Sequence, residues 1–300
     1  MLKRLNIYFR EMFPLPARML LAMIVFGEVH FLVLLNYKIT EFSVGIQEFT
    51  AVYTIFSFYL WLRIADDFKD YELDKRLFAH RPLPSGRVEK KDLILICALV
   101  QAFALLLNLL FMNNLLFFIL LYAYGFLMSK WFFQKSKIQP NLFLALITHN
   151  PVQMIVNLYT ISFTCIKYGL KPFSWITFFV MWTLYFPSLI WEISRKIRAP
   201  KEETEYVTYS KLFGYRESTR FIMIITIMDI MTNIVLIWNI NRYFILLFII
   251  LVSWMTAQFL RYIKDPYRFR IVSKVETYTY LQELMMLLTI AIHVLYQRLA

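Results

Sequence analysis

Residues 61–91, WLRIADDFKDYELDKRLFAHRPLPSGRVEKK, concentrate charge between two long apolar runs. The stretch holds four aspartates and eight Lys or Arg residues. Asp67, Asp70 and Asp74 are spaced by three and four residues. On a helix that continues out of the preceding apolar run they therefore share one face, and Asp66 stands beside it. This spacing predicts a cluster of carboxylates at one helix end.

The residues that follow, Arg81-Pro82-Leu83-Pro84-Ser85-Gly86-Arg87, predict a loop that carries two guanidinium groups. Two prolines and a glycine end a helix, and Arg binds phosphate through parallel N–H donors. Carboxylates held together repel unless a cation lies between them, and Mg²⁺ takes one or two carboxylates together with phosphate oxygens. The arrangement predicts a magnesium-bridged diphosphate. The alternative is a charged helix end among lipid headgroups, with Asp and Lys paired along the surface.

The composition places the chain in a lipid bilayer. Of its 300 residues 60% are hydrophobic, whereas soluble domains contain about 45–50% apolar residues. Crossing the hydrocarbon takes about 20 apolar residues in a helix, so the sequence predicts an all-α polytopic membrane protein with about nine transmembrane helices. The expected spans are 18–36, 46–66, 92–112, 114–133, 141–165, 172–192, 219–238, 243–262 and 277–297.

The distribution of basic residues predicts the orientation of these spans. With the N-terminus in the cytoplasm, 27 of the 32 Lys and Arg residues fall on the inner side. The N-terminus and both charged stretches are therefore expected to be cytoplasmic, at the plasma or inner membrane if the source is bacterial. The net charge of +12 reflects this topology and contact with membrane lipids. It does not favour nucleic acid as a partner, because no compact soluble basic module is present.

The first charged stretch resembles the first aspartate-rich motif of the UbiA superfamily of intramembrane prenyltransferases. That motif usually reads Asn-Asp-x-x-Asp-x-x-x-Asp, so Asp66 replaces the asparagine and keeps an oxygen ligand. The resemblance implies a UbiA-like helical bundle. It predicts one transmembrane domain, residues 1–300, whose cytoplasmic loops 67–91 and 193–218 carry the charged motifs.

The second charged stretch follows the sixth expected span and departs from the family pattern. Thr208-Tyr209-Ser210 and Gly214 match the family's tail, but Glu192 followed by Arg195 and Lys196 stands where aspartates are expected. Glu192 carries over as a metal ligand. The cations favour direct contact with the diphosphate in place of a second Mg²⁺. The alternative is that they form an ordinary basic flank of a membrane span.

Two further sets of polar residues occur inside apolar runs. Tyr124 and Lys130 resemble the Tyr and Lys that follow the fourth helix in the family, where the lysine reaches the diphosphate; the alternative for Lys130 is snorkelling to the headgroups. His149 and Asn150 precede Pro151 within the fifth span. Such intramembrane groups usually face a cavity, so they either position an acceptor or bridge helices.

The resemblance implies Mg²⁺-dependent transfer of a prenyl group from an allylic prenyl diphosphate to a lipophilic acceptor. The alternatives are a UbiA-type terpene cyclase and a non-catalytic membrane transporter or scaffold. The acceptor and the prenyl chain length stay open. The expected catalytic residues are Asp67, Asp70 and Asp74; the metal ligands Asp66, Asp67, Asp70, Asp74 and Glu192; the diphosphate-binding residues Arg81, Arg87, Lys130, Arg195 and Lys196; and the acceptor or cavity residues His149 and Asn150.

Overall fold

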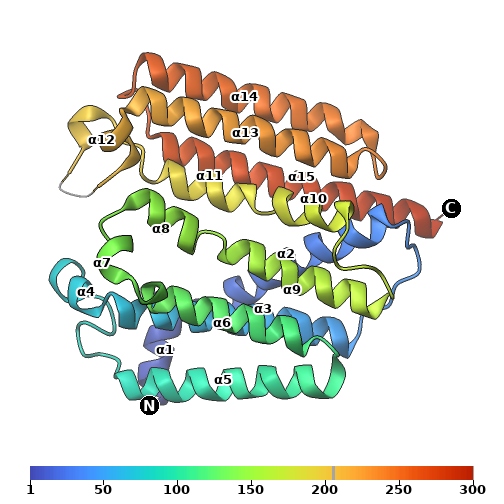
Figure 1. The fold of residues 1–300 in the computed structure, drawn as a ribbon, viewed down its shortest axis with the longest axis horizontal. Coiled ribbons are helices and arrows are strands. Elements are labelled where there is room, and N and C mark those ends of the chain that lie inside the picture. Colours follow the sequence, from blue (N-terminus) through green and yellow to red (C-terminus); the bar gives the residue numbers. More distant parts are fainter. Residues whose placement is uncertain (205–206, 300) are drawn as a thin grey trace. The chain divides into compact units, whose positions relative to one another are not determined.

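The computed structural model describes residues 1–204 and 207–299, and every regular element in these ranges is helical (Figure 1). This confirms the all-α prediction. The elements are α1 (Leu2–Glu11), α2 (Leu15–Asn36), α3 (Ile46–Lys69), α4 (Tyr71–Leu77), α5 (Lys90–Phe111), α6 (Leu115–Ser129), η1 (Trp131–Phe133), α7 (Lys135–Ile138), α8 (Leu142–His149), α9 (Val152–Lys167), α10 (Trp175–Thr183), α11 (Phe186–Ser194), η2 (Pro200–Glu202), α12 (Tyr209–Phe213), α13 (Tyr215–Ile237), η3 (Arg242–Phe244), α14 (Ile245–Lys264) and α15 (Ile271–Leu299).

Seven helical segments in the described residues are long and apolar enough to cross a membrane. They are Leu15–Asn36, Lys90–Phe111, Leu142–Lys167, Trp175–Ser194, Tyr215–Ile237, Arg242–Lys264 and Ile271–Gln297. The chain is thus a polytopic membrane protein, but the count of nine spans is not confirmed. The second expected span is helix α3, whose last two turns carry charged side chains. The fourth is α6, which has only 15 residues.

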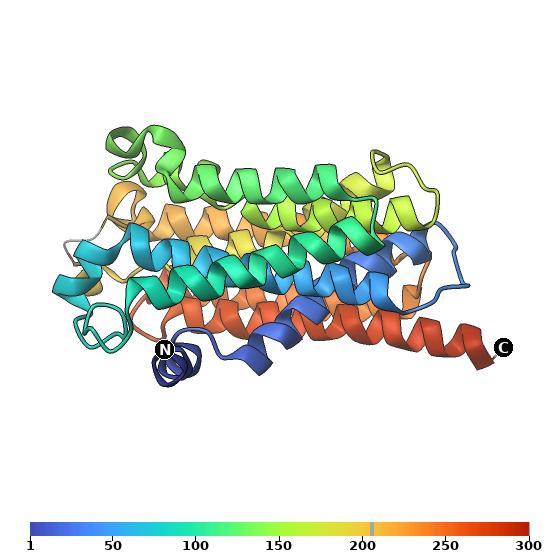
Figure 2. The same cartoon turned by 90° about the horizontal axis from the view of Figure 1, so that it is seen from below.

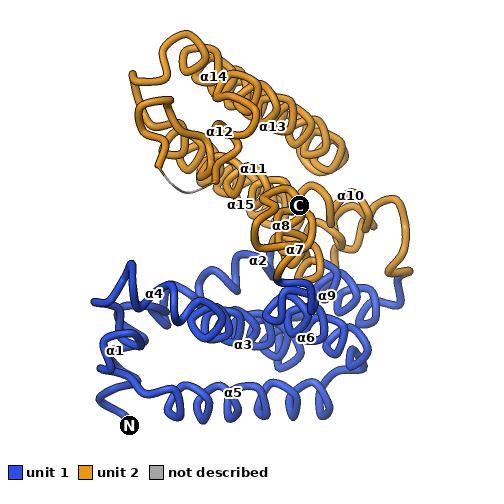
Figure 3. The backbone as a smooth tube through the Cα atoms, turned by 60° about the vertical axis from the view of Figure 1, so that its left-hand side comes forward, with its two compact units in different colours: residues 1–27, 42–135, 158–170 blue, residues 28–41, 136–157, 171–300 orange. Residues whose placement is uncertain are grey.

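The helices form two compact units (Figure 3). Unit 1 comprises residues 1–27, 42–135 and 158–170, and unit 2 comprises residues 28–41, 136–157 and 171–300. Boundaries fall inside α2, α7 and α9, so each of these helices contributes a part to either unit. The first charged stretch belongs to unit 1 and the second to unit 2.

In unit 1, α3 packs against both α5 and α6. Both α3 and α5 can be seen in the turned view of Figure 2. The α3 to α6 contact depends on Gly125. A Cβ atom at this position would lie 2.5 Å from a ring carbon of Trp61 and 2.8 Å from one of Phe58. Because real contacts are longer, only glycine allows the two helices to approach this closely.

Polar side chains inside unit 1 are joined to one another. The Asn108 side-chain amide donates to the Thr54 hydroxyl at 2.8 Å, and the Tyr159 hydroxyl donates to the Asn108 carbonyl oxygen at 2.9 Å. Asn114 accepts from Ser162 at 2.9 Å. These bonds supply the partners that a buried polar group needs away from water.

In unit 2, α13, α14 and α15 pack side by side (Figure 1). Asp229 on α13 is fully buried and accepts hydrogen bonds from three side chains. Their donors are the hydroxyl of Tyr278 and the amides of Gln282 and Asn233, at 2.8–3.1 Å. The network holds a carboxylate inside the membrane-spanning part of the unit because it replaces the hydrogen bonds of water.

Proline interrupts the fifth expected span. Helix α8 ends at His149, and α9 begins at Val152, directly after Pro151. A proline lacks the N–H that would continue the hydrogen-bond ladder. The sixth span is also divided, at Leu184 between α10 and α11.

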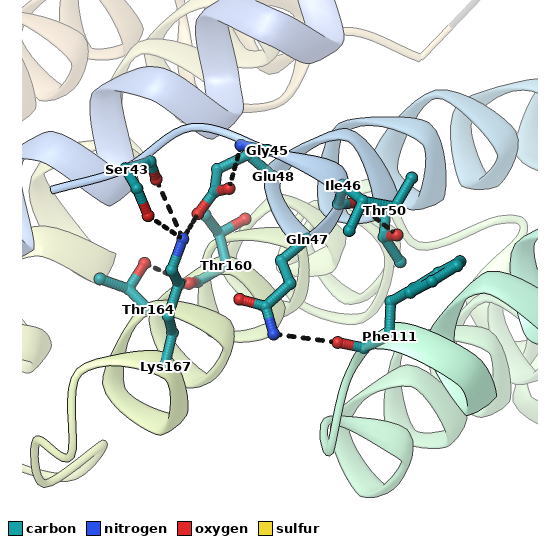
Figure 4. A network of polar contacts seen from close by, with 10 residues as sticks. All are labelled: Ser43, Gly45, Ile46, Gln47, Glu48, Thr50, Phe111, Thr160, Thr164 and Lys167. Carbon is teal, nitrogen blue, oxygen red and sulfur yellow. Dashed lines mark hydrogen bonds and ion pairs between the residues drawn. The ribbon is translucent and has the colours of Figure 1, made fainter.

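A buried ion pair anchors the start of α3 to the end of α9 (Figure 4). The Lys167 ammonium contacts the Glu48 carboxylate and donates to the backbone carbonyl of Ser43 at 3.0 Å. Glu48 also accepts from the backbone N–H of Gly45 at 2.8 Å, which caps α3. The side chains of Lys167 and Glu48 are only 13% and 4% exposed, so both charges are largely removed from water.

We expect Lys167→Met to lower the free energy of unfolding by about 3 kcal/mol, because it leaves a buried carboxylate without its cation. The midpoint of thermal unfolding in detergent measures this loss. The double variant Glu48→Gln/Lys167→Met should recover part of it, since neither charge remains. Lys38→Met, at an exposed lysine without an ion pair in the described residues, is the control. Equal loss in the single and double variants would contradict the role of the pair.

Candidate functional site

The helix that carries the aspartates is interrupted at Asp70. Helix α3 ends at Lys69, α4 begins at Tyr71, and Asp70 between them has φ −103° and ψ 11°. The predicted single helical face is therefore replaced by two helices that meet at this residue. Aspartate favours such ends because its short side chain competes with the backbone for hydrogen bonds. Helix α4 ends at Leu77, four residues before the predicted loop.

Asp67 is buried and held by two partners. Its carboxylate contacts the Arg63 guanidinium at 2.6 Å, one helical turn earlier on α3, and accepts from the Tyr8 hydroxyl at 2.7 Å. Tyr8 lies on α1 and is itself fully buried. The N-terminal helix thus fixes the position of the first buried aspartate of the motif.

Asp74 and the following loop are fixed by arginines. The Arg81 guanidinium donates to the buried Asp74 at 2.8 Å. Arg87 forms a two-bond pair with Glu11 on α1, at 2.5 and 2.8 Å, and donates to the carbonyl of His80 at 2.6 Å. The hydrogen bond from the Arg87 guanidinium lowers the pKa of the Glu11 carboxyl, whereas desolvation of Glu11 opposes this shift. Both predicted loop arginines therefore have acidic partners in the protein.

A cavity of about 360 Å³ lies beside these arginines within unit 1. Its lining includes Arg63, His80 and Arg81, with Glu11 on the same wall. Arg63 and Arg81 already pair with Asp67 and Asp74, so an anion in this cavity would share their guanidinium donors with these acids.

Asp66 and Asp70 have a different environment from Asp67 and Asp74. Asp66 pairs with Lys69 at 3.3 Å, and the Lys69 ammonium lies 4.6 Å from the centre of the Trp131 ring. Burial raises the pKa of the Asp70 carboxyl, and the negative charges of Asp66 and Asp74 raise this pKa further. The positive charges of Lys69 and Lys135 oppose the rise. Asp70 thus lies within the electrostatic reach of two acids and two lysines.

Lys130 caps α6 and precedes an unusual turn. Trp131, Phe132 and Phe133 have φ values of 53°, 50° and 57°, so three consecutive residues are left-handed. Each such residue costs roughly 1–2 kcal/mol. Ring contacts of Phe132 with Tyr124 and of Phe133 with Phe126 oppose that cost. Lys130 is exposed and makes no ion pair in the described part of the chain.

The first motif offers the donor atoms that Mg²⁺ uses. Carboxylate oxygens are hard ligands, and the interaction of Asp70 with Asp66 and Asp74 brings negative charge together. Among the described residues no three His, Cys, Asp or Glu side chains lie close enough to hold a metal ion by themselves. Mg²⁺ needs only one or two carboxylates when phosphate oxygens and waters complete its shell, so these residues fit a metal that is shared with a diphosphate.

The two cations of the second motif directly follow α11 and both reach Glu192. Lys196 pairs with Glu192 at 2.8 Å. Arg195 also reaches Glu192, at 3.4 Å, but its guanidinium stacks 4.5 Å from the ring centre of Trp191. Trp191 in turn donates weakly to Glu276 on α15, at 3.4 Å. Arg195 is therefore directed toward α15, whereas Lys196 remains with the acid.

The tail of the second motif surrounds Glu203. The hydroxyls of Thr208 and Ser210 donate to its two carboxylate oxygens at 2.7 and 2.5 Å. Burial raises the pKa of the Tyr209 hydroxyl between them, and Glu192 raises it further. Gly214 follows with φ 82°, a left-handed conformation that suits glycine. The predicted tail residues thus order the chain after α11.

His149 and Asn150 lie in unit 2, at the break between α8 and α9. The Thr148 hydroxyl is 3.0 Å from the His149 Nδ1 atom. The side-chain amide oxygen of Asn150, Oδ1, is buried and has no hydrogen-bond partner in the described residues. An unsatisfied buried acceptor suits a ligand that can donate a hydrogen bond.

Four residues near the first motif are not predicted from the sequence: Tyr8, Glu11, Arg63 and Lys135. Arg63 had a signal, because it stands four residues before Asp67 on the same helix face. Tyr8 and Glu11 had none, because they precede their partners by 59 and 76 residues.

Comparisons with known proteins bear on the family and the fold of the chain. Residues 41–274 match the model of the UbiA prenyltransferase family. Among solved structures the chain is similar to that of a digeranylgeranylglyceryl phosphate synthase in membranes. The sequence identity is 14% and the TM-score 0.68, over 97% of this chain and 99% of the other. This similarity establishes the fold. No curated protein matches the chain.

We expect Tyr8→Phe to lower the free energy of unfolding by about 1–3 kcal/mol, because Asp67 loses a hydrogen bond while the ring is kept. Amide hydrogen exchange of residues 2–11 should accelerate. Tyr71→Phe is the matched control, since the Tyr71 hydroxyl makes no hydrogen bond within the described ranges. Unchanged stability and exchange in Tyr8→Phe would show that α1 does not depend on this bond.

Proposed function

Because the chain belongs to the UbiA prenyltransferase family, we propose that it transfers a prenyl group from an allylic prenyl diphosphate to a lipophilic acceptor within the membrane, with Mg²⁺ as cofactor. The observation that carries this proposal is the first motif. Its four aspartates adjoin the cationic side chains of Arg63, Arg81 and Lys69 at one helix junction. A diphosphate that reacts with the help of a divalent cation needs carboxylates to hold the cation and N–H donors to bind the phosphate oxygens. Both kinds of group occur at this junction.

In this proposal Asp66, Asp67, Asp70 and Asp74 supply the metal ligands, and Glu192 contributes from the second motif. Bound Mg²⁺ neutralises charge that builds on the departing diphosphate. The allylic carbon–oxygen bond breaks and the diphosphate leaves with the electron pair. The acceptor forms the new bond to the allylic carbon and releases a proton.

The diphosphate is assigned to Arg81, Arg87 and Lys130, with Arg195 and Lys196 from the second motif. Lys130 is free of ion pairs in the described residues, so its three donors remain available. Arg87 must exchange Glu11 for a phosphate oxygen, because the carboxylate occupies both of its terminal nitrogens. His149 and Asn150 are assigned to the acceptor, for which the unsatisfied Asn150 oxygen is the supporting observation.

The basic second motif predicts one tightly bound Mg²⁺ per protein rather than two. Lys196 already neutralises Glu192, so a second metal would have to displace it. Isothermal titration of the protein with Mg²⁺, in the presence of a non-hydrolysable prenyl diphosphate analogue, measures the stoichiometry. Two equivalent ions that are both essential for binding the analogue would contradict the assignment of the cations.

We expect Asp70→Asn to reduce turnover roughly 100-fold or more, because it removes a charged group at the reacting diphosphate. The assay follows diphosphate release and product mass for geranyl, farnesyl and geranylgeranyl diphosphate, with and without Mg²⁺ and a lipid extract of the source membrane. The extract is supplemented with glyceryl phosphate acceptors, as the name of the similar solved structure suggests. Asp265→Asn, at an exposed aspartate after α14, is the control.

The products separate the competing functions. Release that needs both Mg²⁺ and the extract supports the transferase, and the mass shift identifies the acceptor. Release without extract, with a cyclic hydrocarbon or alcohol as product, means a terpene cyclase. Absence of both release and binding means a transporter or scaffold that no longer uses the aspartates for catalysis.

A further inference from the structure

A second basic cavity lies wholly within unit 2, away from the residues of the first motif. Its volume is about 300 Å³. The walls come from the chain after α11, the end of α14 and the start of α15. The side chains that matter for its chemistry are Arg195, Arg198, Glu202, Tyr262 and Arg270.

Three guanidinium groups from two segments, the chain after α11 and the chain before α15, line this cavity. Arg195 is held against Trp191, and Arg198 donates to the Thr204 hydroxyl at 2.8 Å. Arg270 precedes α15 and is exposed, and its guanidinium forms no ion pair or hydrogen bond in the described part of the chain. Glu202 is the one acid in the lining, so the cavity carries a formal charge of +2. The ion pair of Arg195 with Glu192 compensates part of this charge, whereas Arg270 keeps its charge without an acidic partner in the described residues.

The floor of the cavity adds one polar donor to an apolar surface. Tyr262 is 1% exposed, and its hydroxyl has no hydrogen-bond partner within residues 1–204 and 207–299. Buried Ile197 and Ile271 lie beside it. The Tyr262 hydroxyl is therefore available to donate a hydrogen bond to a ligand in the cavity.

These features select a phosphate group as the ligand. Guanidinium forks match phosphate oxygens in pairs, and several oxygens let one phosphate accept from three arginines and a hydroxyl. The cavity also lies at the ends of three candidate membrane spans, where basic pockets between helices bind lipid headgroups. A cation is excluded as the ligand by the net positive charge.

We propose that this cavity is a phosphate-binding site, occupied by the headgroup of an anionic lipid or by a soluble phosphate ester. Lipid occupancy would tie α11, α14 and α15 to the membrane surface next to the second motif. The site shares Arg195 with the residues assigned to the diphosphate, but its ligand is bound without being converted, and the variants that test it leave Arg195 in place.

The test uses the full chain in mixed micelles and compares phosphatidylglycerol with phosphatidylcholine. Inorganic phosphate and glycerol 3-phosphate are added in separate arms. Native mass spectrometry gives the apparent affinity, and the thermal unfolding midpoint gives an independent readout. The variants are Arg198→Gln/Arg270→Gln, which removes two donors, and Glu202→Gln, which removes the opposing charge. Arg216→Gln, at an exposed arginine outside the cavity, is the control.

A lipid ligand requires that phosphatidylglycerol bind the wild type more tightly than phosphatidylcholine. The double variant should then lose about 20- to 30-fold in affinity, roughly fivefold for each arginine. Glu202→Gln should gain about fivefold, a change that misfolding cannot produce. If the variants change the affinity for glycerol 3-phosphate or inorganic phosphate in this order, and leave the affinity for the lipid unchanged, the ligand is a soluble phosphate. Equal affinities in all variants, or no preference for any phosphate probe, would overturn the proposal.

Discussion

A buried carboxylate is stabilised by a fixed partner, and at several acids this constraint determines how the interior is built. Removing one charge from water costs several kcal/mol even after the protein relaxes. Asp67 therefore has Arg63 and Tyr8, Glu48 has Lys167, and Asp229 has three hydrogen-bond donors. Each partner comes from a specific position, so each acid also fixes how two segments meet. At the first motif this means that the aspartates are oriented before any ligand arrives.

Most of the helices could be predicted, because hydrophobicity and length act locally along the chain. The interruption at Asp70 could not, because spacings of three and four residues look the same in one continuous helix as in two helices that meet. The partners from α1 were also hidden. Nothing near Tyr8 or Glu11 indicates which residue, dozens of positions later, will need a hydroxyl or a carboxylate.

The second motif illustrates what a linear run of charges conceals. Arg195 and Lys196 are neighbours in sequence, yet successive residues at a helix end point about 100° apart. Lys196 stays with Glu192, whereas Arg195 turns toward α15 and joins arginines from other segments. The sequence predicts one basic cluster, but the helix geometry divides its members between two surroundings. The hydroxyl contacts of Glu203 likewise depend on a chain reversal that the sequence signals only through Gly214.

The left-handed turn after α6 has a consequence for proteolysis. Trp131, Phe132 and Phe133 form a run of aromatic residues that chymotrypsin-like proteases prefer, and Phe133 is 71% exposed. Such proteases bind their substrates as extended strands, so this turn must open before it can be cut. Where opening and closing are fast, the rate of cleavage follows the population of the open form. Nicking at this point would therefore report the local stability of the turn beside Lys130.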